Sequence, residues 1–481
     1  MNQSGDLLPF TEIVPASASF SAPERSSILT SRRRVRVVPQ TGPSLGAAGA
    51  GGGNQQVQFL IADQGGLLDL RSVCLNYTIL TSGAALPTCD DGHPFSTVQV
   101  LLNGQLLENV QSAAKLANVN AAMGMSQSYY KSAGSMQGFE LLNHDLVTTS
   151  TANIGYGNVA LNQPSCQART SRVAAPVFNN IAGKQVSIPL AMVCDLGLCP
   201  TYIPIALIGE LSIVLQSLSA NEALFSITAA STVADYSLSN MAIEYDIIVP
   251  DPRYFALLQK IATEEGPGLV IPFQSSIVST GAIIPTSASL TETSIIVSRA
   301  TNNLLKSNVV FVPTSQISAL GYPSQSCFGH AGVYSMQWRI GSQVYPQTAA
   351  QGDASLFNMS LLASGSVMQE NGTVINRCLF ANSTNAAVVG TSAVFETAEL
   401  ATGGTTKFAF GDRFIPSYGF QTVKGGSQNL TVDGVSVAGA SGSQIIVSVI
   451  SAGGTNYTPY VVTTGLKFVV AKQGGVSVVG A

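Results

Sequence analysis

The side chains best suited to chemistry in this chain of 481 residues are three histidines and seven cysteines. Cys327 and His330 form a Cys-x-x-His pair, which is half of a zinc site, and Cys194 with Cys199 could complete a set of four ligands. Neither pair has a spacing typical of zinc sites, so we interpret Cys327 as a loop thiol and His330 as a solvated imidazole. The sequence contains no Gly-x-Ser-x-Gly, phosphate-loop or His-Glu-x-x-His motif. We therefore expect no catalytic residue, no metal ligand and no bound cofactor.

Two pairs of neighbouring acids are candidates for general acid–base chemistry or for Ca²⁺ binding: Asp90-Asp91 and Glu264-Glu265. Both pairs fall in expected loops or helix ends, and residues adjacent in sequence rarely face one site. We interpret them as solvated turns.

The basic run of the sequence comprises Arg32, Arg33, Arg34 and Arg36. Such a run can be an arm that contacts nucleic acid or anionic lipid. It is too short to carry strong phosphate affinity alone, because each phosphate contact contributes modestly and is screened by salt. The alternative, which we favour, is the exposed face of a strand that continues into Val37-Val38-Pro39.

The cysteines and the N-terminal residues indicate a compartment. The cysteine count is odd, and residues 1–20 contain Asp6 and Glu12 without a continuous apolar segment, so we expect no signal peptide. An intracellular, reducing origin follows, with most thiols acting as small buried hydrophobes. The apolar segment Val186–Gly209 contains Asp195 and three prolines, which argues against a membrane span. We expect two buried strands there, joined by a turn at 195–200.

Composition excludes several classes of protein. Charged residues make up only 10% of the chain, against roughly 25% in an average soluble domain, while glycine alone contributes 46 residues. Coiled coils and helical bundles need more Glu, Lys and Arg, and disordered chains need lower hydrophobicity. A net charge of −4 provides no field that would hold a polyanion over the whole surface.

Short runs with β-type composition, separated by Gly, Pro, Asn and Ser, dominate the chain and predict an all-β fold. The expected strands include 57–62, 72–80, 96–102, 186–193, 209–216, 241–249, 308–313, 333–340, 444–450 and 466–470. Helical spacing predicts inserted helices at 104–123, 252–265 and 355–362. The second of these helices lies near the middle of the chain, where we expect it to couple two halves. The expected domains are an arm at 1–24, a first unit at 25–251, a linking helix at 252–267, a second unit at 268–472 and a loosely held tail at 473–481.

In order and spacing, these segments resemble the double jelly-roll major capsid proteins of the adenovirus and tectivirus lineage, nearest to the branches of virophages, polinton-like viruses and large DNA viruses of eukaryotes. The resemblance rests on Phe95–Asn109, Val186–Leu190 with Ile203–Leu207 and Glu210–Leu215, Tyr245–Phe255, and Trp338–Pro346. It implies two tandem eight-stranded antiparallel jelly rolls with a few short helices. It also implies a homotrimer of pseudo-hexagonal outline that tiles the icosahedral shell of a double-stranded DNA virus.

The partners that the resemblance implies are other copies of the chain and penton and minor capsid or cement proteins, without a small-molecule substrate. It places the chain in the virion, assembled inside the host cell. It also suggests an inner membrane or genome contact through Arg32, Arg33, Arg34 and Arg36. Two alternatives differ in class. A surface adhesin or receptor-binding sandwich shares the composition, and a carbohydrate-active enzyme would need an aromatic cleft and paired acids, whereas this chain has one tryptophan.

Overall fold

The computed structural model describes most of the two expected units and leaves several long connections undescribed. The described residues are 29–42, 44–45, 55–62, 65–83, 88–89, 93–125, 137, 184–225, 234–263, 268–318, 324–326, 328–364, 414–421, 434–437, 444–472 and 475–479. The expected arm at 1–24, both acid pairs and Cys327 lie outside these ranges.

The first half of the chain forms two four-stranded antiparallel sheets that pack face to face. One sheet has the order β1-β10-β3-β7, and the other has the order β2-β8-β5-β6. Their bounds are β1 (Leu29–Val37), β2 (Gln56–Ile61), β3 (Leu67–Gly83), β5 (Phe95–Leu102), β6 (Gln105–Gln111), β7 (Lys184–Pro189), β8 (Leu211–Ser217) and β10 (Ala234–Pro250). A short pair, β4 (Thr88–Cys89) and β9 (Leu224–Phe225), lies apart from both sheets, and helix α7 (Ala220–Ala223) precedes β9.

The second half repeats this arrangement strand for strand. Its sheets have the orders β11-β18-β13-β16 and β12-β17-β14-β15. When β4 and β9 are left out, both halves have the same order: the first, eighth, third and sixth strands form one sheet, and the second, seventh, fourth and fifth form the other. Their bounds are β11 (Leu269–Thr280), β12 (Thr291–Ser298), β13 (Leu304–Pro313), β14 (Val333–Ile340), β15 (Gln343–Gln351), β16 (Ser417–Gly419), β17 (Gln444–Ser451) and β18 (Tyr457–Lys472). A short 3₁₀ turn, η5 (Thr314–Gln316), follows β13. Each half is an eight-stranded jelly roll, as the resemblance to capsid proteins implies.

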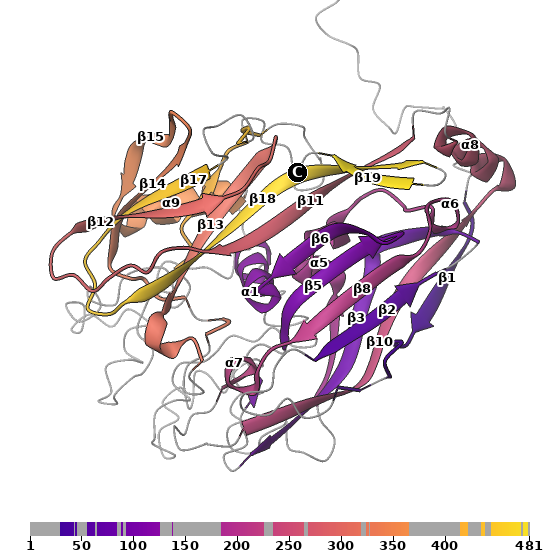
Figure 1. The fold of residues 1–481 in the computed structure, drawn as a ribbon, viewed down its shortest axis with the longest axis horizontal. Helices are drawn as coiled ribbons and strands as arrows, with labels where there is room; N and C mark the ends of the chain where they lie inside the picture. The colour runs from indigo at the N-terminus through magenta and orange to yellow at the C-terminus, as the bar shows by residue number, and fades with distance from the viewer. Residues whose placement is uncertain are drawn as a thin grey trace, which may run out of the picture.

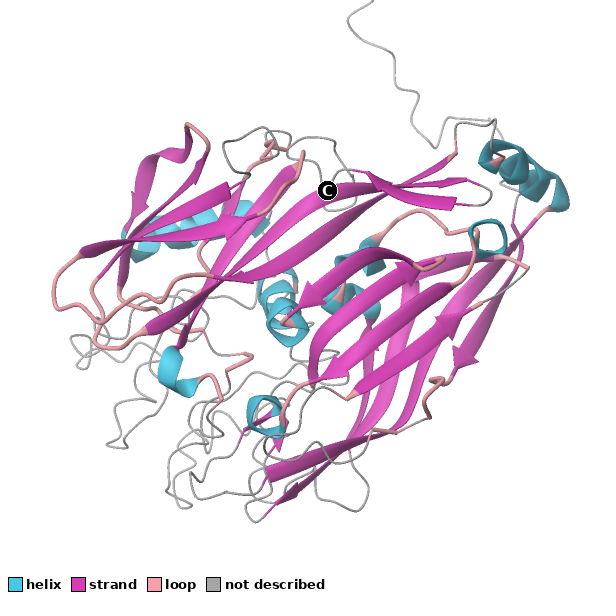
Figure 2. Ribbon diagram, viewed as in Figure 1, coloured by secondary structure: helices cyan, strands magenta, loops and turns pink. Residues whose placement is uncertain are grey.

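The halves also carry corresponding helices. Helix α1 (Ala113–Gly124) follows β6, and helix α9 (Gly352–Ser364) follows the equivalent strand β15. Figure 1 shows the two jelly rolls beside each other, with the long strands β11 and β18 reaching across the edge of the first. Figure 2 shows how strands dominate both halves, with the helices at their ends and edges.

Period-two alternation explains why these segments are strands. Along β17, buried and half-buried side chains alternate without a break, so one face lines the core of the second jelly roll. The largest fully buried side chains anchor both cores: Trp338, Tyr77, Tyr245, Phe59, Phe95, Phe273, Phe311, Phe328 and Phe414.

The helix predicted at 104–123 is wrong from 104 to 112. Asn103 (φ 48°) and Gly104 (φ 77°) both have left-handed backbone conformations, which is the signature of a type I′ hairpin turn. This turn folds β6 back on β5, with Leu102 opposite Gln105. The helix α1 begins only after Ser112, so the apolar residues between 106 and 110 belong to a strand.

The pair of buried strands predicted within Val186–Gly209 is also wrong in its second member. After β7, the chain forms three short helical turns before β8: α5 (Leu190–Val193), η4 (Asp195–Leu198) and α6 (Ile205–Ile208). Pro204 stands at the start of α6, and Gly209 (φ 117°) ends it. These two residues break the extended conformation that the hydrophobicity alone suggests.

The linking helix α8 (Pro252–Ala262) starts where the sequence predicts. The Asp251 side chain accepts a hydrogen bond from the Arg253 N–H at 2.8 Å, and Pro252 occupies the first turn. Only Ala262 of this helix is buried, and α8 lies at a corner of the molecule in Figure 1. The expectation that α8 couples the halves therefore finds little support in its packing.

The tail predicted to be loosely held contains a strand. Residues Gly475–Val479 form β19, which pairs antiparallel with the end of β18 from Phe468 to Lys472. The alternating valines of this segment supply the β-branched side chains that a strand favours.

Gly332 offers a test of the turn that precedes β14. Its φ is +65°, and a Cβ atom there would lie 1.9 Å from the carbonyl oxygen of Ala452. Gly104 has a similar φ of +77° with nothing within 4 Å of the same position. We expect Gly104→Ala to lower the free energy of unfolding by about 1 kcal/mol through backbone strain, and Gly332→Ala by at least about 1 kcal/mol more. Urea unfolding measures both, and equal losses would contradict the clash.

Candidate functional site at the seam between the jelly rolls

Among the described residues, the largest group of interacting polar and charged side chains lies where the two jelly rolls contact each other. We call this contact the seam. The first jelly roll contributes Glu108, Lys115, Asn120, Cys194, Asp195 and Cys199, and the second contributes Pro272, Ser276, Gln325, Tyr460 and Thr464.

Two buried acids occupy the middle of the seam. The Glu108 carboxylate accepts hydrogen bonds from the Cys194 thiol at 2.8 Å, the Leu196 N–H at 3.0 Å and the Ser276 N–H at 3.2 Å. Asp195 accepts from the Asn120 amide at 3.2 Å and from the Ser276 hydroxyl. Ser276 belongs to β11, so one residue of the second jelly roll bonds to both acids of the first.

The electrostatics of this cluster follow from burial. Desolvation, with the nearby charge of Asp195 as the second cause, raises the pKa of Glu108 to about 7. Burial also raises the pKa of the Cys194 thiol well above its ordinary value, so this thiol stays protonated and donates. In the second jelly roll, burial lowers the pKa of Arg299 to about 10, while the charges of Glu108 and Asp195 oppose that change.

A buried cation lies further along the seam. The Lys115 ammonium donates to the Gln325 side-chain oxygen at 2.8 Å and stands 4.7 Å from the centre of the Tyr460 ring. Lys115 is only 4% exposed although it projects from α1, a helix of the first jelly roll. An amide oxygen and an aromatic face together replace the water that a lysine normally requires.

Known proteins match this chain in structure but not in sequence. Neither a scan against protein-family models nor a sequence search of curated proteins finds a match. Solved structures do match over nearly the whole chain. The VP54 protein of PBCV-1, in a structure fitted into a reconstruction of the virophage Sputnik, has a TM-score of 0.54 at 9% identity and covers 96% of this chain and 99% of its own. The mavirus major capsid protein has a TM-score of 0.54 at 11% identity, with 100% and 97% covered.

The Faustovirus major capsid protein has a TM-score of 0.51 at 9% identity, covering 94% of this chain and 93% of its own. The chain has the double jelly-roll fold. The fold class expected from the sequence is confirmed. At sequence identities of 9 to 11%, the similarity to these proteins shows a shared fold alone.

The candidate metal ligands that the structure describes, His330, Cys194 and Cys199, are not grouped to hold a metal ion. His330 is buried, not solvated as predicted, because its Nε2 atom lies 2.9 Å from an Asp353 oxygen and its ring lies 4.2 Å from that of Phe414. Cys194 and Cys199 are free, buried thiols on the seam. Within the described part of the chain, no three His, Cys, Asp or Glu side chains are grouped to hold a metal ion.

The arginine run of the double jelly roll forms strand β1, which is the alternative that the sequence favours. Arg32 pairs with Asp246 and lies 3.7 Å from an Asp69 oxygen, and Arg34 donates to Glu244 at 3.1 Å. These carboxylates, on β10 and β3, raise the pKa of Arg32 and of Arg34. The cluster is thus a ladder of ion pairs on the outer face of one sheet. Among the described helices, none is long and apolar enough to cross a membrane.

Substitution of Arg32 tests how much this ladder stabilises the fold. Because the Arg32 side chain is largely exposed, solvent screens its attraction to Asp246. We expect Arg32→Gln to lower the free energy of unfolding by less than about 1 kcal/mol, and the loss to shrink in 1 M salt. Thermal unfolding at two salt concentrations measures it, and a large loss that is independent of salt would contradict the screened pair.

Sequence reasoning missed the seam. The sequence predicts one helix for both Glu108 and Lys115, and a turn for Asp195. The signal that could have found the acid is the Asn103-Gly104 dipeptide, which is typical of a hairpin turn and would have put Glu108 on a strand.

Proposed function

We propose that this chain is a viral major capsid protein whose homotrimers, pseudo-hexagonal in outline, tile an icosahedral shell. The observation that carries the proposal is the duplicated strand order over the full chain, a fold that it has in common with the mavirus and Faustovirus major capsid proteins. On this proposal the chain acts by assembly and not by catalysis, and its location is the virion.

Internal repetition explains how a trimer would acquire a hexagonal outline. Within the chain, β6 and the element η4 of the first jelly roll contact β11, the leading strand of the second. The equivalent surfaces, β15 on the second jelly roll and β1 on the first, carry mostly exposed or half-exposed side chains. A neighbouring copy that placed its β1 near this β15 would repeat the internal contact, and three copies would close a ring of six similar units.

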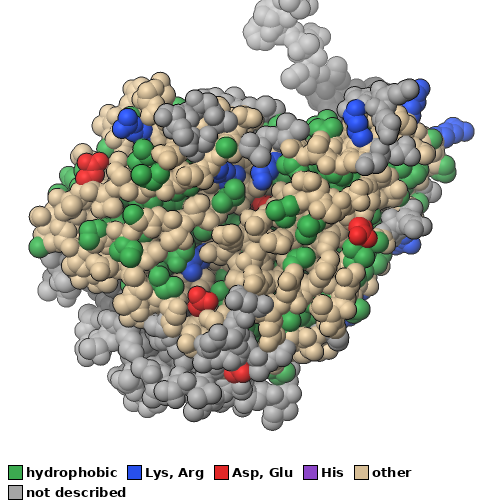
Figure 3. Space-filling view, viewed as in Figure 1, with side chains coloured by type: hydrophobic (Ala, Val, Ile, Leu, Met, Phe, Trp, Pro, Cys, Tyr) green, Lys and Arg blue, Asp and Glu red, His purple; other side chains and the backbone are tan. Residues whose placement is uncertain are grey.

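The surface composition is compatible with dense packing of identical copies. Figure 3 shows one face covered mainly by uncharged atoms, with few charged side chains. Sparse charge limits the repulsion between like surfaces that meet many times in a shell.

Other partners form a finer part of the proposal. They are penton and minor capsid proteins and, through Arg32, Arg33, Arg34 and Arg36, an inner membrane or genome. The ion pairs of Arg32 and Arg34 weigh against strong phosphate binding, because a neutralised guanidinium offers less charge to an anion. The comparisons contain nothing that favours the adhesin alternative.

Light scattering on the purified full chain tests the proposal. We expect a stable species of about 149 kDa, three times the chain mass of 49.8 kDa, and hexagonal arrays of this species in electron micrographs. A well-behaved monomer would overturn the proposal and would direct attention to glycan-binding screens.

A further inference from the structure

We propose that Glu108 and Asp195 make the seam a proton-dependent latch, which holds the two jelly rolls together most tightly while the acid pair retains a proton. The proposal concerns the contact within one chain, so it stands independently of the proposed capsid function.

The geometry of the pair carries the inference. Both acids belong to the first jelly roll and both are fully buried, with exposures of 1% for Glu108 and 3% for Asp195. Both bind the same residue of the second jelly roll, since Ser276 offers its N–H to Glu108 and its hydroxyl to Asp195. The hydrogen bonds that join the halves at this point therefore end on two carboxylates whose charges repel each other.

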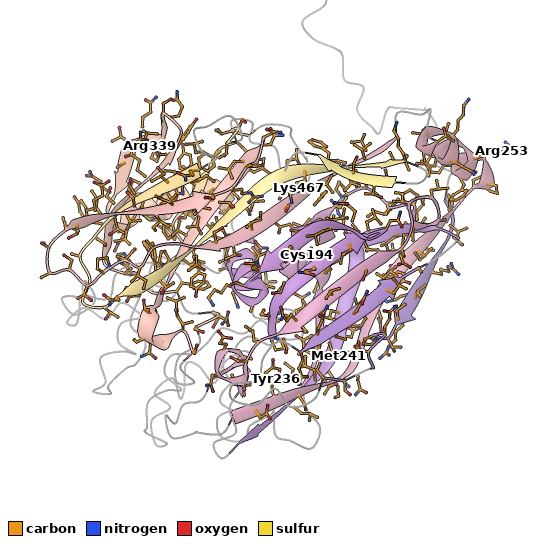
Figure 4. All side chains as sticks on the ribbon, viewed as in Figure 1. Cys194, Tyr236, Met241, Arg253, Arg339 and Lys467 are labelled. Atoms are coloured by element: carbon orange, nitrogen blue, oxygen red, sulfur yellow. The ribbon has the colours of Figure 1, made fainter. Side chains whose placement is uncertain are left out.

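The other charged groups around Glu108 do not neutralise the pair directly. From the first jelly roll, the Cys194 thiol faces Glu108 and remains protonated. From the second jelly roll, Arg299 and Lys467 approach, and Figure 4 labels Lys467 on β18 and Cys194 in the first jelly roll below it. The Arg299 guanidinium directs its hydrogen bonds to Thr463 and to the carbonyl of Ser275, within its own jelly roll. Its charge acts on the acids from a distance and not as a hydrogen-bonded partner.

The sign of the pH dependence follows from these surroundings. The pKa of Glu108 rises from its ordinary 4.5 to about 7 when the seam is closed, because of burial first and the charge of Asp195 second. Opening the seam returns the side chain to water and its pKa toward 4.5. The stabilisation by the retained proton is therefore complete below pH 4.5 and is lost as the pH rises through 7.

Hydrogen–deuterium exchange on the full chain tests the latch. The reporters are the amides of Leu196 and Ser276, both of which bond to Glu108, and their rates are corrected for the intrinsic pH dependence of exchange. Between pH 5 and pH 8 we expect the opening constant of the seam to rise at least tenfold in the wild-type protein. Glu108→Gln, which has no proton to lose, should flatten this dependence, while the exposed control Glu292→Gln should keep it. A flat wild-type profile, or an unchanged slope in Glu108→Gln, would overturn the proposal.

A second variant protects the test if Glu108→Gln fails to fold. Asp195→Asn removes the like charge but leaves Glu108 ionisable, so the pH at which the seam loosens should move downward. An unmoved transition in Asp195→Asn would show that the two acids do not act together and would overturn the latch.

Discussion

Trp338→Ala is expected to lower the free energy of unfolding by about 3 to 5 kcal/mol. Trp338 is fully buried on β14, where its ring stacks on that of Tyr418 with a distance of 5.6 Å between ring centres. Its indole N–H donates to the Ser307 hydroxyl at 3.2 Å. Alanine would leave a large cavity and would also remove the buried hydroxyl's donor, and the two costs add.

The measurement must take account of the fact that this is the single tryptophan of the chain. Its fluorescence reports wild-type unfolding, but the variant has to be followed by circular dichroism. The matched control is Trp338→Phe, which keeps an aromatic ring against Tyr418 and should lose clearly less than the alanine variant. Equal losses in the two variants would contradict the cavity as the main cause.

Lys115→Glu is expected to be the most damaging single substitution at the seam, with a loss of at least about 3 kcal/mol. A carboxylate at this position would meet the Gln325 side-chain oxygen and the electron-rich face of Tyr460, both of which attract the wild-type ammonium. The Gln325 oxygen and the Tyr460 ring would then repel the buried charge, so the halves should separate more readily.

Thermal unfolding and limited proteolysis together measure this effect, because separated jelly rolls expose the strands that join them. The matched control is Lys260→Glu on the exposed helix α8, which reverses the same charge and should change stability by no more than about 0.5 kcal/mol. Similar losses in both variants would show that net charge, and not the seam, determines the result.

The strands could be predicted from the sequence because each carries its own evidence. Met241, Ile243, Tyr245 and Ile247 share one face of β10 with Glu244 and Asp246 on the other, and all four apolar residues are buried. This local pattern reports which face of a strand is covered, whatever the rest of the chain does. The helices α8 and α9 were found for the same reason, since proline placement and helical spacing are local signals.

The seam could not be predicted, because its contacts join residues that are distant in the chain. Lys115 and Gln325 are 210 positions apart, and Glu108 and Ser276 are 168 apart. Each side chain alone reads as an ordinary surface residue, since buried lysine and glutamate are rare without partners. The partners become visible only when the second jelly roll has been placed against the first.

The strand β18 has a consequence for how this chain can change over evolutionary time. Its residues from Thr458 to Leu466 are all buried, and Tyr460 among them contacts Lys115 of the first jelly roll. In β17, by contrast, every second side chain is only half-buried. Drift can therefore proceed at alternate positions of β17, whereas β18 leaves no position neutral over nine consecutive residues. Among descendants of this sequence, β18 should therefore accumulate substitutions more slowly than β17, and it should keep a recognisable sequence similarity for longer.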